Sequence, residues 1–216
     1  MDADLFSDHL ENPRGLGLLE GASHRGSAGG AACGDVIDFR VECSEDGSLQ
    51  VGFDCSGCGA LTAAASAATS LAWGRDLLGA ARVSTELIAD ELGGLPESKV
   101  HAAELACDAL HRALGSAART ASLQPRQGRN LVAMSGGVDS SLVAALSSES
   151  GEAVGVTLEL WRDERTDAAA SCCSHVAVRR ARSLAHSIGI PHLTLDLRDE
   201  FRAGVVDPWL DAHSAG

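Results

Sequence analysis

The chain has 216 residues, of which 45% are apolar, so it is long enough for one large domain or two small ones. Its net charge of −13 is concentrated in the first half: residues 1–117 hold 7 basic and 18 acidic side chains, whereas residues 118–216 hold 10 and 12. The acidic first half argues against binding of nucleic-acid phosphates there, and the lack of an apolar run near ~18 residues argues against a membrane span.

The N-terminus and the seven cysteines indicate a reducing compartment. The chain begins Met-Asp-Ala-Asp-Leu-Phe, which has neither the positive charge nor the apolar stretch of a secretory signal. We therefore expect a cytoplasmic protein with no membrane partner. In such a protein, cysteines are metal ligands or catalytic groups before they are disulfides.

The first predicted elements are a loop and a β-hairpin. Residues 21–32 are rich in glycine and are expected to form a mobile loop. Apolar and charged side chains then alternate through residues 35–43 and 49–53, on either side of the turn signal Glu45-Asp46-Gly47. This alternation predicts a hairpin with one buried face. The side chains of its first strand expected on that face are Ile37, Phe39, Val41 and Cys43.

Three helices are predicted after the hairpin, at residues 61–72, 85–92 and 99–114. The last one carries an apolar stripe that includes Cys107. Residues 1–117 are therefore expected to form an α+β domain, a small sheet plus helices. Residues 118–129 are small and polar and include a proline, which is typical of a linker.

Two cysteines of this first module stand between small, flexible neighbours, in Cys33-Gly34-Asp35 and Gly57-Cys58-Gly59. Glycine allows thiolates and a ligand to approach closely. Cys33, Asp35 and Cys58, together with His101 at the start of the last helix, would suit zinc or iron. The other histidines, such as His9, His24 and His111, are expected at the surface.

These motifs resemble the U-type iron–sulfur cluster scaffolds, IscU and NifU. The matching segments, in order, are Asn12-Pro13-Arg14-Gly15, Ala32-Cys33-Gly34-Asp35, Ser56-Gly57-Cys58-Gly59 and Lys99-Val100-His101. The resemblance covers about residues 5–115. It implies that the cysteines hold a nascent iron–sulfur cluster or a zinc ion, and that Asp35 keeps a bound cluster labile.

One position departs from the family pattern, because Ala102 stands where the scaffolds have a third cysteine. Cys107 lies five residues further, about 7.5 Å along a helix, and on the apolar stripe, so it is expected in the core. Cys55 is the better substitute, since Cys55-Ser-Gly-Cys58 is a C-x-x-C segment on a tight turn. Cys55 equally continues the inward face of Phe53, and both interpretations are open.

A phosphate site is predicted at Ser135-Gly-Gly-Val-Asp-Ser-Ser141, between an apolar strand and a helix. Glycines let the backbone approach an anion, and the helix start offers N–H groups and a positive dipole end. Serine hydroxyls add donors, and Asp139 could hold magnesium. The segment has neither the lysine of a Walker A loop nor the GxGxxG spacing of a dinucleotide site.

The second module alternates strands and helices: strands at 131–134, 153–159 and 192–196, and helices at 139–148 and 174–188. This order predicts an α/β domain with a parallel sheet, whose ligands bind at the carboxyl ends of the strands. The basic cluster Arg179, Arg180 and Arg182 fits either a solvated helix face or an RNA contact.

Residues 130–216 resemble the N-terminal part of the MnmA-type tRNA-specific 2-thiouridylases, PP-loop ATP pyrophosphatases that adenylate their substrate. The resemblance rests on the Ser135–Ser141 loop, on residues 154–161, 172–174 and 184–192, and on Phe201-Arg-Ala-Gly-Val-Val-Asp-Pro-Trp-Leu210. It implies a truncated PP-loop domain that binds ATP with magnesium. The residues expected to bind the nucleotide are Ser135, Gly136, Gly137, Asp139, Ser140, Ser141 and, through its backbone beside the adenine, Leu158.

The thiouridylase resemblance also implies a catalytic cysteine in an Asn-Pro-Cys context, which these 216 residues do not contain. Cys172 and Cys173 do not occupy that position and are expected to be ordinary thiols at a helix start. Such a position can lower the pKa of a thiol, so a redox or metal-binding role is also open. No catalytic residue is therefore assigned. We expect a scaffold module coupled to ATP-dependent thiolation of the wobble uridine of tRNA, with a cysteine desulfurase or another sulfur donor as partner and tRNA bound by a later segment. One alternative is a cluster scaffold with a vestigial ATP-binding half-domain, and another is a first module that is a structural zinc domain.

Overall fold

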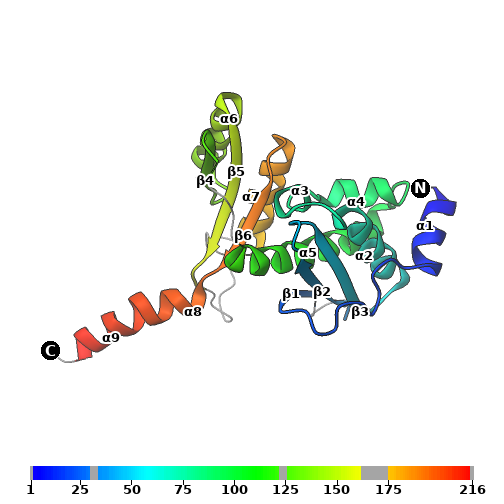
Figure 1. The fold of residues 1–216 in the computed structure, drawn as a ribbon, viewed down its shortest axis with the longest axis horizontal. Coiled ribbons are helices and arrows are strands. Elements are labelled where there is room, and N and C mark those ends of the chain that lie inside the picture. The colour runs from blue at the N-terminus through cyan, green and yellow to red at the C-terminus, as the bar shows by residue number, and fades with distance from the viewer. Residues whose placement is uncertain (1, 30–33, 122–125, 162–174, 215–216) are drawn as a thin grey trace. The chain divides into compact units, whose positions relative to one another are not determined.

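The computed structural model describes residues 2–29, 34–121, 126–161 and 175–214. The chain divides into two compact units, Met1–Pro125 and Arg126–Gly216 (Figure 1). Among the described residues, no helix is both long enough and apolar enough to cross a membrane.

The first unit is an α+β domain built on an antiparallel sheet in the order β1-β2-β3. Its strands are β1 (His24–Gly29), β2 (Val36–Cys43) and β3 (Leu49–Ser56). The predicted hairpin is confirmed as β2 and β3, in which Phe39 pairs with Phe53. Their ring centroids lie 5.8 Å apart, and both side chains are fully buried.

Helices pack on this sheet and on one another, and their buried side chains supply the rest of the core. They are α1 (Ala3–Glu11), α2 (Gly59–Ala72), α3 (Leu77–Ala80), α4 (Thr85–Glu91), the 3₁₀ turn η1 (Glu97–Lys99) and α5 (Val100–Thr120). α5 packs on β1 and β2, α2 packs on β3, and the two helices contact each other (Figure 1). Cys107 is 1% exposed, which confirms its predicted place in the core.

The expectation of a mobile loop at residues 21–32 is wrong for the part that forms β1. This strand pairs antiparallel with β2 from His24 opposite Val41 to Gly29 opposite Val36. A Cβ atom on Gly26 would lie 2.2 Å from the nitrogen of Ala113 and 2.4 Å from the carbonyl oxygen of Ala109. Gly26 therefore lets α5 lie directly on the strand. Residues 30–33 lie outside the described part.

Cys43 is a second correction, because its side chain is exposed and does not join the buried face. It is the last residue of β2 and precedes the turn. The last two residues of β2 are exposed, even though apolar and charged side chains continue to alternate in the sequence.

The second unit contains a parallel sheet in the order β4-β5-β6, as predicted. Its strands are β4 (Arg129–Ala133), β5 (Glu152–Glu159) and β6 (His192–Asp196), and α6 (Val138–Ser150) and α7 (His175–Ser187) connect them. α6 and α7 contact the sheet and each other. The shared core is formed by Val132, Met134, Ala144, Ala153, Ala181, Ala185 and Ile190.

Three short helical segments follow β6: α8 (Arg198–Phe201), the π-helical turn η2 (Arg202–Val206) and α9 (Asp207–Ser214). None of their described residues is buried. Between the units, α5 continues to Thr120, past the expected start of the linker, and β4 begins at Arg129.

We predict that Gly26→Ala destabilises the first unit by about 1–3 kcal/mol, since the added methyl group meets the backbone of α5. Gly21→Ala is the matched control, because nothing lies within 4 Å of a Cβ atom there. Urea denaturation followed through Trp73, in a background with Trp161→Phe and Trp209→Phe, measures both. Equal midpoints for the two variants would contradict the close approach.

We also predict that the second unit loses stability in acid through His192. This residue is fully buried, and burial, aided by the charges of Arg182 and His186, lowers its pKa to about 3. The folded ring is therefore neutral, whereas the unfolded chain binds a proton below pH ~6.5. The contribution is complete above that pH and is lost as the pH falls toward 3.

The loss approaches ~1.4 kcal/mol for each pH unit below about 6. Urea denaturation at pH 7, 6 and 5, followed through Trp161 and Trp209 in a Trp73→Phe background, measures it with His192 present and with His192→Gln. The variant should show a shallower pH dependence. Parallel curves for the two proteins would show that His192 does not cause the effect.

Candidate functional site

Three potential metal ligands from separate elements meet at one end of the first unit. Asp35 lies just before β2, Cys58 is the residue that caps the start of α2 after β3, and His101 lies in the first turn of α5. The pairing of Val36 with Ser56 brings the two ends of the hairpin together. The packing of α5 on the sheet then brings in His101.

The ligand atoms of Asp35, Cys58 and His101 all lie within 4.8 Å of one another. Asp35 Oδ1 accepts a hydrogen bond from the backbone N–H of Cys58 at 3.0 Å, and Oδ2 accepts one from the thiol at 3.4 Å. His101 Nε2 lies 3.8 Å from the same Oδ2. The carboxylate is thus held by the backbone through one oxygen and faces the thiol and the imidazole with the other.

Gly57 makes this arrangement sterically feasible. A Cβ atom at that position would lie 2.3 Å from Asp35 Oδ1. Any larger residue would therefore displace the carboxylate from the N–H of Cys58. Gly57 thus makes room for the carboxylate of Asp35, whereas its sequence context predicts room for a bound ligand.

This donor set fits zinc or iron. It combines a thiol, an imidazole and a carboxylate, the ligand types that these borderline metals accept. Asp35 is 5% exposed, whereas Cys58 and His101 are half-buried, so the site has a protected carboxylate and an accessible side. Metal binding would remove the thiol proton, which frees Oδ2 from its present hydrogen bond for coordination.

The other predicted ligands lie elsewhere or beyond the described residues. Cys33 falls outside the described part of the chain. Cys55 lies in β3 with its Sγ 3.4 Å from Thr62 Oγ1 of α2, and it is not among the grouped ligand atoms. Ala102 is fully buried in α5. The geometry thus groups Asp35, Cys58 and His101, and a role for Cys33 or Cys55 stays a prediction.

Two histidines expected at the surface are buried instead. His9 is 4% exposed, and its Nδ1 lies 2.9 Å from Ser66 Oγ in α2. His111 is fully buried, and its Nε2 donates to the carbonyl of Val83 at 2.8 Å. The sequence pattern could not reveal these hydrogen bonds, because the partners are 57 and 28 residues away.

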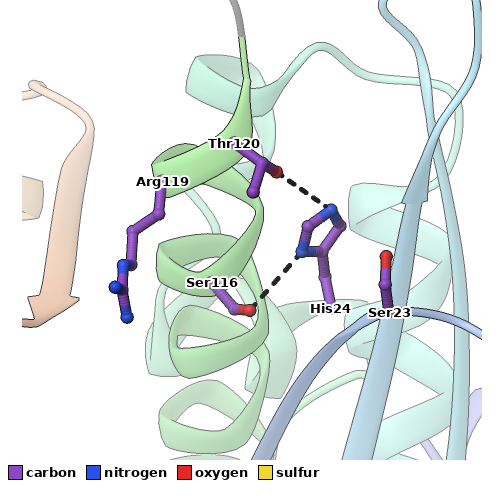
Figure 2. Close-up of a pocket in the computed structure, with 5 residues that line it drawn as sticks. All are labelled: Ser23, His24, Ser116, Arg119 and Thr120. Carbon is purple, nitrogen blue, oxygen red and sulfur yellow. Dashed lines mark hydrogen bonds between the residues drawn. The ribbon is translucent and has the colours of Figure 1, made fainter. Parts of the chain in front are cut away.

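An open cavity of about 490 Å³ lies at the other end of α5, lined by Ser23, His24, Ser116, Arg119 and Thr120. The His24 ring contacts two hydroxyls of α5, Thr120 Oγ1 at 3.1 Å and Ser116 Oγ at 3.5 Å (Figure 2). In this view the Arg119 side chain extends away from the ring. The contacts tie β1 to the last turns of α5, ~28 Å from His101 along the helix.

The predicted phosphate loop in the second unit runs from the end of β4 into α6, whose N-cap is Gly137. Gly136 has a φ of +77°, and a Cβ atom there would lie 2.8 Å from the carbonyl oxygen of Ala177. No side chain among the described residues caps the first turn of α6. The first turn of α6 therefore offers backbone N–H groups that no described side chain caps, the feature by which helix N-termini bind phosphate.

Serine hydroxyl groups of the loop Ser135–Ser141 form hydrogen bonds to its own backbone. Ser140 Oγ accepts from the backbone N–H of Ser135 at 3.3 Å and donates to the carbonyl of Gly137 at 3.2 Å. Ser141 Oγ donates to the same carbonyl at 2.7 Å. Asp139 is exposed in the first turn of α6. Leu158 is 40% exposed one residue before the end of β5, and Cys172 and Cys173 lie outside the described residues.

Comparison with known proteins divides the chain in the same way. The family model described as NifU-like N terminal domain matches residues 2–121, and the model described as tRNA methyl transferase HUP domain matches residues 129–216. The chain is 43% identical over 224 aligned positions to the bifunctional protein NifU/MnmA of Rubrobacter xylanophilus, an alignment that covers 97% of this chain and 45% of that protein.

Other relatives match one part only. The iron–sulfur cluster assembly scaffold protein IscU 1 of Archaeoglobus fulgidus is 36% identical over 53% of this chain and 74% of its own length. The tRNA-specific 2-thiouridylase MnmA of Parvibaculum lavamentivorans is 44% identical over 43% of this chain and 24% of its own length. Among solved structures, an N-terminal NifU-like protein from Brucella abortus matches 54% of this chain and 94% of its own, with a TM-score of 0.41 and 17% identity.

Proposed function

Because the chain belongs to the family of NifU-like N-terminal domains and continues into a tRNA methyl transferase HUP domain, we propose a function for each of its two units. The first unit is proposed to assemble an iron–sulfur cluster as cargo. The second is proposed to bind ATP with magnesium. In a longer protein, the two would support ATP-dependent thiolation of the wobble uridine of tRNA.

The grouping of Asp35, Cys58 and His101 is the observation that carries the scaffold proposal. Cys33 is proposed as the second thiolate, which would complete a set of two sulfurs, one nitrogen and one oxygen. Carboxylate oxygen is the hardest of these ligands and the least suited to a soft cluster. Asp35 is therefore the ligand that would leave first when the cargo is passed on.

The Asp35 carboxylate can exchange one hydrogen-bond partner for a metal ion while the backbone of Cys58 still holds it in position. Oδ1 is bonded to the N–H of Cys58, so only Oδ2 has to exchange between the metal and the ligand side chains. Because Cys58 and His101 are half-buried, incoming iron and sulfur can reach them from solvent. The sulfur is proposed to come from a cysteine desulfurase or another sulfur donor.

The loop Ser135–Ser141 supports the ATP proposal. Its glycine turn, its helix N-terminus and its hydroxyls are suited to the pyrophosphate part of ATP. Asp139 is proposed to hold the magnesium ion that neutralises the phosphates. The adenine is proposed to lie near the backbone of Leu158 at the carboxyl end of β5.

Binding of tRNA is proposed only for a longer protein that would contain this chain. This chain spans 45% of the length of the bifunctional relative, and its sequence contains no Asn-Pro-Cys segment. Arg182 is 6% exposed, so Arg179, Arg180 and Arg182 do not form one exposed basic patch. Joining the two units in one chain would raise the effective concentration of a sulfur-handling module beside a sulfur-inserting one.

The scaffold proposal predicts that Cys58→Ser lowers bound iron at least about tenfold, because the variant lacks one of the thiolates that would bind iron directly. Cys43→Ser is the control, because that thiol is exposed at the end of β2, away from the ligand group. Anaerobic reconstitution with ferrous iron and sulfide, followed by visible absorption and metal analysis, measures both. Equal iron content in Cys58→Ser and the native chain would refute the site, and bound zinc without cluster absorption would favour a zinc domain.

The ATP proposal predicts that Ser140→Ala weakens binding of ATP with magnesium by about tenfold, because a hydroxyl of the phosphate loop is lost. Ser148→Ala provides a control on the same helix, since its hydroxyl donates to the carbonyl of Ala145 outside the loop. Calorimetric titration of each full chain measures the affinity. The loop would not be the ATP site if both variants bound ATP as the native chain does.

A further inference from the structure

A series of hydrogen bonds crosses the sheet of the second unit and ends at Met134, the residue immediately before the phosphate loop. Thr157 of β5 lies between Met134, which follows β4, and His192, the first residue of β6. Its Oγ1 is 2.7 Å from the carbonyl oxygen of Met134 and 2.9 Å from Nε2 of His192. The series therefore links all three strands of the sheet.

The direction of this series follows from its donors. The Met134 carbonyl can only accept, so it takes the single hydroxyl proton of Thr157. Thr157 must then accept from the ring, which places a proton on Nε2 of His192. The other ring nitrogen, Nδ1, is buried and has no hydrogen-bond partner among the described residues. Among the described residues, Thr157 is therefore the hydrogen-bond partner of the imidazole.

The surroundings exclude water and leave little freedom. Met134 and Thr157 are each 3% exposed, and His192 is fully buried. A Cβ atom on Gly155 would lie 2.7 Å from Met134 Sδ and 3.2 Å from His192 Cδ2. Glycine at this position therefore makes room for both side chains, and no solvent can replace a missing partner.

The peptide bond between Met134 and Ser135 passes this constraint to the loop. Because a trans peptide is planar, its carbonyl and N–H point in opposite directions. Fixing the Met134 carbonyl on Thr157 fixes the N–H of Ser135, which donates to Ser140 Oγ at 3.3 Å. Ser140 then donates to the carbonyl of Gly137, the N-cap of α6, at 3.2 Å.

All four hydrogen bonds run in the same sense, from His192 through Thr157, the Met134–Ser135 peptide and Ser140 to Gly137. Bonds aligned in this way polarise and strengthen one another. We propose that Thr157 and His192 are positioning residues for phosphate binding, because they lock the orientation of the peptide that begins the loop. The inference rests on the proposed binding of ATP by Ser135–Ser141.

The test compares Thr157→Val with Thr157→Ser in the full chain. Valine keeps the shape and removes the hydroxyl, so ATP–magnesium affinity should fall about tenfold, the value of roughly one hydrogen bond. Serine restores the donor and should return the affinity to within about threefold of native. Calorimetric titration with ATP and magnesium gives the affinities, and circular dichroism verifies that each chain is folded.

Thr194→Val is the matched control. Thr194 pairs with Thr157 in the register of β5 and β6 and is 5% exposed, but its hydroxyl has no hydrogen-bond partner among the described residues. Its loss should leave ATP affinity unchanged. If a buried hydroxyl mattered only for the stability of the sheet, Thr157→Val would bind ATP as tightly as native, and that result overturns the proposal.

Two further outcomes are decisive. If Thr157→Val does not fold, Thr157→Ser and Thr157→Cys are compared, because the thiol is close in size to the hydroxyl and a much weaker donor. Affinity should then fall from serine to cysteine, and equal affinities overturn the inference. A native chain that does not bind ATP refutes the proposed function and this inference together, whereas a native chain that binds beside an equal Thr157→Val refutes the inference alone.

Discussion

The close approach of α5 to the sheet is the constraint on which the first unit depends. At Gly26 the backbone of the helix lies where any side chain would be, so the helix is seated directly on β1. One end of the same helix carries His101 to Asp35 and Cys58, and the other end holds His24 with Ser116 and Thr120. A helix held farther from the sheet would shift the imidazole out of reach of the other two ligands.

Both units place backbone hydrogen bonds behind the groups that are proposed to bind ligands. In the first, the N–H of Cys58 holds one oxygen of Asp35 and leaves the other to face the thiol and the imidazole. In the second, Thr157 holds the carbonyl that precedes the phosphate loop. Each interaction orders a group that is proposed to bind a ligand, and such ordering in advance would lower the entropic cost of binding.

The two units differ in charge in a way that suits different ligands. Residues 1–125 carry 8 basic and 18 acidic side chains, and residues 126–216 carry 9 and 12. An acidic surface attracts metal cations and repels nucleic acid, whereas a nearly neutral one is compatible with a nucleotide whose charge is balanced by magnesium. This division agrees with the proposed metal cargo of the first unit and the proposed phosphate ligand of the second.

The sequence predicted the hairpin and the alternating strands and helices of the second unit, and the structure confirms both, because they rest on local periodicity. Short motifs predicted the phosphate loop and the metal ligands, and ligand binding at these motifs stays a prediction. Features that depend on partners far away in the sequence became visible in the folded chain. The glycine-rich segment around Gly26 favours a mobile loop, but the backbone of α5 lies directly on it. The sequence places His9 and His111 at the surface, but both are buried, beside Ser66 and the Val83 carbonyl. The hydrogen-bond chain through Thr157 and His192 was equally hidden, since its members are neighbours only after three strands pair. Local patterns reveal which face of an element is apolar, but not which backbone or polar atom another element brings to it.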